Sequence, residues 1–92
     1  MSMDLVISED GTVMIASNAP FSGSVARVDF DGAQRCLTLS FEEKERADET
    51  LNLEPHSRML SALLKAPSVL LVEVRHNAPV RGYSVPLTHS VF

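Results

Sequence analysis

The sequence predicts a single compact α+β domain over residues 1–92. In it, one amphipathic helix near residues 55–66 covers a mostly antiparallel sheet of about six or seven short strands. Two observations predict this class: several short segments alternate apolar with polar residues, as half-buried strands do, and one later segment carries apolar residues at helical spacing. The expected order is β-β-β-β-(β)-α-β-β, and strands segregated from the helix are typical of α+β domains. A curled or partly open barrel, or a sandwich with the helix closing one end, also fits this order.

The first two strands are expected at residues 3–8 and 12–17, which are aliphatic and β-branched runs separated by Glu9-Asp10-Gly11. An Asp-Gly pair between two such runs indicates a hairpin, because glycine adopts the positive φ that a tight connection needs. The pattern ends at Asn18-Ala-Pro-Phe-Ser-Gly23, where proline removes a backbone donor, so the chain is expected to turn there.

A second hairpin is expected from residues 24–31 and 36–41, because both segments alternate and Asp31-Gly32 repeats the hairpin signal. The residues expected on the inner face are Ala26, Val28, Phe30, Leu37, Leu39 and Phe41.

The segment 42–49 carries five acids with Lys44 and Arg46, and Ala47 is its only apolar residue. It therefore has no face to pack, and we expect a solvated turn or a strand extension. Residues 50–53 follow, in which Leu51 and Leu53 alternate as in a short strand. A helical turn is the alternative.

One helix is expected between Pro55, which suits a first helical position, and Pro67, which ends the helix after Ala66. Its apolar stripe consists of Met59, Leu60, Leu63 and Leu64, and the opposite face of Arg58, Ser61 and Lys65. A helix of this length is marginal alone in water, so we expect packing of the stripe on the sheet to stabilise it.

Two strands follow the helix. Residues 69–74 are apolar on both faces, which indicates an interior strand and makes this segment the best candidate for the centre of the sheet. In the last strand Tyr83, Val85 and Leu87 alternate with polar or small residues. Pro86 cannot donate to a neighbouring strand, which predicts that this strand lies at an edge.

The composition favours a cytoplasmic protein. Cys36 is the only cysteine, so no disulfide forms within the chain, and no segment has the roughly 20 apolar residues of a membrane span. The net charge is −4, made up of −7 over residues 1–54 and +3 over residues 55–92. An acidic chain without a Lys/Arg cluster is not expected to bind nucleic acid, and neither a membrane nor a cofactor is expected as a partner.

The sequence alone identifies no specific function. No catalytic constellation is visible, and the three histidines at positions 56, 76 and 89 lack metal-ligand spacing, so no metal is expected. The pattern favours a non-enzymatic interaction or accessory domain that binds a protein partner or forms a homodimer through an exposed strand edge. The alternative is a small-anion or small-ligand binding domain, or a weak hydrolase. Its candidate ligand-binding residues are Arg75, His76, Arg81 and Tyr83, which crowd around one loop.

Overall fold

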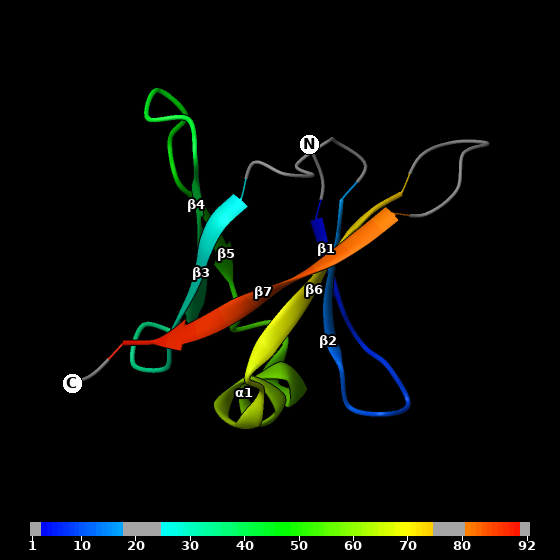
Figure 1. The fold of residues 1–92 in the computed structure, drawn as a ribbon. Helices are drawn as coiled ribbons and strands as arrows, with labels where there is room; N and C mark the ends of the chain where they lie inside the picture. The colour runs from blue at the N-terminus through cyan, green and yellow to red at the C-terminus, as the bar shows by residue number, and fades with distance from the viewer. Residues whose placement is uncertain (1–2, 18–24, 75–80, 91–92) are drawn as a thin grey trace.

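The structure, a computed structural model, describes residues 3–17, 25–74 and 81–90. Seven strands and one helix form within these residues, which confirms the α+β class and the expected order of elements (Figure 1). In chain order they are β1 (Met3–Ile7), β2 (Val13–Ser17), β3 (Val25–Asp31), β4 (Cys36–Phe41), β5 (Glu49–Asn52), α1 (Ser57–Lys65), β6 (Ser68–Glu73) and β7 (Arg81–His89).

The seven strands form a single sheet in the order β1-β2-β6-β7-β3-β4-β5. Four neighbouring pairs are antiparallel, whereas β2–β6 and β3–β7 are parallel, so the sheet is mixed. Figure 1 shows that it curls into a half-barrel, as the curled alternative predicts, with α1 at the end where the β1–β2 and β3–β4 turns lie.

The parallel pairs arise because β6 and β7 lie between the β1–β2 pair and the group β3-β4-β5. The antiparallel pair β6–β7 lies between β2 and β3, and each of its strands runs parallel to its outer neighbour. The two parallel pairs therefore join strands that are far apart in the chain; Val28 of β3, for example, pairs with Leu87 of β7. Sequence alternation identifies the strands but contains no information about this insertion.

The prediction that the last strand lies at an edge is wrong. β7 is the central strand and β6 lies beside it, so the expected centre is also displaced by one strand. The backbone N–H of Leu87 donates to the Pro67 carbonyl on the β6 side at 3.0 Å. Because successive backbone groups of a strand point to opposite edges, the nitrogen of Pro86 faces β3, and pairing with β3 begins only at Leu87. The missing donor of Pro86 therefore interrupts no ladder.

The core lies on the inner face of the half-barrel and receives α1 along a narrower stripe than expected. Met59 and Leu63 are buried, Leu60 is partly buried, and Leu64 is 66% exposed. The helix begins at Ser57 rather than at Pro55, and it ends at Lys65, one residue earlier than expected, because Ala66 is already extended before Pro67. The fully buried strand residues of the core cluster are Val13, Ile15, Val28, Leu37, Leu39, Val69 and Leu71.

The two hairpin turns differ in their backbone. Gly11 has φ +89°, as the Asp-Gly signal predicts. The second turn spans residues 32–35, since Asp31 pairs with Cys36, and its positive φ belongs to Arg35 (+55°) rather than to Gly32. The carboxylate of Asp31 accepts hydrogen bonds from the backbone N–H groups of Ala33 and Gln34, both at 3.0 Å, which closes this longer turn.

Two further expectations change at the ends of β3 and β4. A register shift between Val25 and Arg27 places Ala26 outside and Val25 inside, so Ala26 does not join the inner face. Residues 42–48 are an exposed turn, in which the Arg46 guanidinium stacks 3.6 Å from the centre of the Phe41 ring. The helical alternative for the following segment is wrong, because this segment forms β5 on β4.

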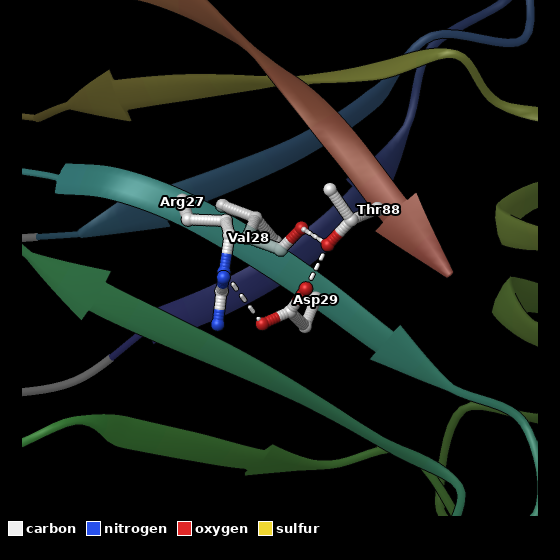
Figure 2. A network of polar contacts seen from close by, with 4 residues as sticks. All are labelled: Arg27, Val28, Asp29 and Thr88. Carbon is white, nitrogen blue, oxygen red and sulfur yellow. Dashed lines mark hydrogen bonds and ion pairs between the residues drawn. The ribbon is translucent and has the colours of Figure 1, made fainter. Parts of the chain in front are cut away.

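A polar network on the exposed side of the sheet reinforces the short β3–β7 ladder, which joins the two halves of the sheet. Figure 2 shows the Thr88 hydroxyl between two acceptors, the Val28 carbonyl 3.2 Å away and the Asp29 carboxylate, which share its single hydrogen. The other carboxylate oxygen of Asp29 lies 2.9 Å from Nε of Arg27. The network thus connects residues 59 positions apart in sequence.

Candidate functional site

The predicted anion site falls largely outside the described residues. Arg75 and His76 lie outside the described residues. Of Arg81 the structure describes the backbone, which pairs with Glu73. Tyr83 is half-buried, pairs with Leu71 and packs against the core cluster. Their convergence on an anion therefore stays a prediction.

A buried polar pair beside this region was not identified from the sequence. Glu73 is 3% exposed and Ser17 is 2% exposed, and the two residues are register partners in the parallel β2–β6 pair. By alternation Glu73 shares the inner face with Val69 and Leu71. The available signal was an acid inside an otherwise apolar strand segment. These two residues make one end of the inner face polar.

The two edges of the sheet differ in their protection against further pairing. β5 has four residues and follows the acidic turn of residues 42–48, and both short length and charge discourage association. β1 has five residues, of which Asp4 is the only charged one. Val6 and Ile7 are 42% and 36% exposed. No other described strand pairs with the outer edge of β1, which we call the open β1 edge, and its side chains are largely apolar.

A groove of about 540 Å³, which we call the β1 groove, lies between β1 and the start of α1. Leu5 and Ile7 line one side of it, and Pro55 and Met59 line the other. His56, Ser57 and Arg58 form an exposed polar rim. The open strand edge and an apolar recess thus lie side by side.

A second groove of about 520 Å³, which we call the α1–β7 groove, lies on the other side of the helix. It is lined by the β3–β4 turn with Arg35, by Leu60 and Leu64 of α1, and by His89 at the end of β7. The Nε2–H of His89 donates to the Leu63 carbonyl at 3.0 Å, because a carbonyl oxygen can only accept.

The β1–β2 turn holds a carboxylate with a perturbed pKa. Hydrogen bonds from the Ser8 hydroxyl and then from Thr12 lower the pKa of Asp10 from its usual 3.8 to about 2. One of these bonds, from the Thr12 backbone N–H, measures 3.0 Å. The hydrogen bonds stabilise the turn in the ionised state and assign no chemistry to it.

Further observations concern metals and membranes. Within residues 3–17, 25–74 and 81–90 no group of three or more metal-ligating side chains gathers. No helix of the described chain has the length and apolar character that crossing a membrane requires.

Comparisons of the chain with protein-family models, with curated proteins and with solved structures gave no match. The inferences about function therefore depend on the geometry of the sheet edges and grooves.

Proposed function

We propose that this chain is a non-enzymatic interaction domain that forms a two-fold dimer through the outer edge of β1. The observation that carries the proposal is the open β1 edge with the exposed side chains of Val6 and Ile7. An unpaired edge offers alternate backbone N–H and C=O groups to an incoming strand. A second copy of β1 is a strand whose own backbone C=O and N–H groups can pair with these donors and acceptors.

The sequence of β1 is compatible with pairing to itself. A two-fold antiparallel pairing centred on Leu5 uses all five residues of β1 and places Met3 opposite Ile7 and Asp4 opposite Val6. No like charges face each other in this register. Centring the pair on Asp4 instead places two carboxylates opposite each other, which is unfavourable. Charge therefore favours the register centred on Leu5 over the one centred on Asp4.

The β1 groove supports the same register. Residues directly opposite in an antiparallel pair have side chains on the same face. Met3 of the second copy thus lies on the face of Ile7, which lines the groove with Leu5 and Met59. By symmetry each copy contributes a Met3 side chain to the groove of the other. Burial of this apolar surface adds to the backbone hydrogen bonds.

The test uses charge at position 6, which is exposed and can be changed without opening the core. Val6→Asp places a carboxylate opposite Asp4 twice per dimer, and each such pair costs about 0.2–1 kcal/mol in addition to the lost valine contacts. We expect the dimer dissociation constant to rise at least about tenfold, measured by sedimentation at several protein concentrations. Val6→Lys instead places an ammonium opposite Asp4 and should preserve the dimer.

Two controls make the test specific to the register. Combining Val6→Asp with Asp4→Lys should restore association, and Thr50→Asp on the opposite edge should leave it unchanged. A wild-type chain that sediments as a monomer at every concentration overturns the proposal. Equal weakening by Val6→Asp and Val6→Lys overturns the register centred on Leu5.

We also propose a cytoplasmic location for this domain. Cys36 is a free, half-buried thiol and the only cysteine of the chain, which suits a reducing compartment. A fluorescent fusion that accumulates outside the cytoplasm would contradict this assignment.

A further inference from the structure

The α1–β7 groove has the form of a small-ligand site. Its volume of about 520 Å³ lies within the range of roughly 300–1,000 Å³ typical of such sites. Phe30, Ala33, Leu60 and Leu64 give it apolar walls. Leu64 is 66% exposed, although it belongs to the apolar stripe of α1. Leu64, together with the exposed part of Leu60, therefore faces the groove instead of the sheet.

Arg35 lines the same groove in an unfavourable backbone conformation. Its φ of +55° is the only positive value at a non-glycine residue in the described chain. Glycine or asparagine adopts this region readily, whereas a longer side chain does so at a cost. The conformation is fixed by the backbone N–H of Leu53, which donates to the Arg35 carbonyl at 2.8 Å. A strained backbone at a groove points to a role of the arginine side chain there.

The guanidinium of Arg35 has no partner among the described residues. An ion pair of the described chain joins Arg27 to Asp29 on the exposed side of the sheet. No hydrogen bond or carboxylate of the described residues engages the Arg35 side chain. Among the described residues no carboxylate pairs with the positive charge that Arg35 presents to this apolar groove. A guanidinium matches a carboxylate with two parallel hydrogen bonds.

His89 is held by two contacts on the β7 side of the groove. Its ring is held by the Nε2–H bond to the Leu63 carbonyl and by an edge-to-face contact with Phe30, with ring centres 5.8 Å apart and planes at 87°. These two contacts join the end of β7 to α1 and to β3. These contacts position the His89 ring in the lining of the groove.

We propose that the α1–β7 groove binds an aliphatic carboxylate, with the carboxylate on Arg35 and the hydrocarbon chain against Leu60 and Leu64. A guanidinium with no ion-pair partner in the described part of the chain matches a single negative charge, and the apolar walls favour an apolar ligand body. The site is separate from the β1 groove, so this proposal does not depend on the dimer.

The experiment titrates the full chain at pH 7 with octanoate and, separately, with uncharged octanamide, and follows backbone amide NMR signals. Octanoate should shift Ala33, Arg35, Leu64 and Ser90 saturably and bind about fivefold more tightly than octanamide, the size expected of a partly solvated guanidinium–carboxylate pair. Absence of saturable shifts at these amides, or equal affinity for both probes, overturns the proposal.

Variants separate the two halves of the site. Arg35→Gln should remove the preference for octanoate over octanamide, whereas Leu64→Ser should weaken both probes by a similar factor. Lys44→Gln, which removes one positive charge from the exposed acidic turn, is the control and should leave both affinities unchanged. Retention of the octanoate preference in Arg35→Gln overturns the role of the guanidinium.

Arg35→Gly distinguishes ligand binding from a structural role of the arginine. Glycine relieves the positive φ, so the variant should unfold at a higher temperature than wild type and still lose the octanoate preference. A variant that is destabilised and keeps the preference would show that Arg35 serves the turn alone.

Discussion

Truncation of Leu63 tests the packing of α1 on the sheet. Leu63 is fully buried in the core cluster, whereas its neighbour Leu64 is 66% exposed. Leu63→Ala removes three buried carbon atoms, worth about 2.4 kcal/mol at about 0.8 kcal/mol each, and the remaining cavity adds to this. We therefore expect a loss of about 3–4 kcal/mol. Leu64→Ala should cost less than about 1 kcal/mol, because most of that side chain is already in water and alanine favours the helix.

The assay is urea unfolding followed by far-UV circular dichroism. A domain of this size has about 5–10 kcal/mol of stability, so Leu63→Ala should remove a third or more of it and lower Tm by at least about 12 °C. The dependence of the free energy on urea should stay the same in both variants, because the fold is unchanged. Equal losses for Leu63→Ala and Leu64→Ala would refute the placement of α1, since the two residues would then be equivalent.

Two other predictions concern polar contacts. The pKa of Asp10 is lowered to about 2, so its ionised form stabilises the fold above about pH 4, and this contribution is lost as the pH falls through 2. In thermal unfolding, wild type should be more stable than Asp10→Asn at pH 7, and this difference in stability should close by pH 2. A difference independent of pH would contradict the role of the ionised carboxylate. Thr88→Val removes the hydroxyl that joins β7 to β3 and should lower the free energy of unfolding in urea by about 0.5–1 kcal/mol, whereas Thr50→Val on the β5 edge should lower it less. Equal effects would show that the polar network does not stabilise the β3–β7 ladder.

The elements could be predicted from local patterns, and the errors occur where distant segments meet. Gly11 and its Asp partner predict the first turn correctly because turn dihedrals depend on adjacent residues. The position of β7 was predicted from Pro86 alone. That prediction failed because the nitrogen of Pro86 faces β3, and β7 pairs with β3 only from Leu87 onward.

The candidate sites could be predicted only in part. An interaction through a strand edge was expected from the sequence, but the structure was needed to identify β1 as the open edge. Arg35 was not predicted, because the Asp31-Gly32 pair indicates a tight turn with the positive φ at glycine, whereas the positive φ falls three residues later. The α1–β7 groove joins segments near residues 30, 60 and 90, and no local pattern connects them.

The sequence by itself determined the strands, the helix and most of the residues that face the core, because alternation and helical spacing depend on neighbours within a few residues. The tertiary structure decided the strand order, the two parallel joins, the open edge at β1 and the burial of Glu73. The physical reason is that strands pair through backbone groups common to all residues, so the choice of neighbour depends on how the whole core closes.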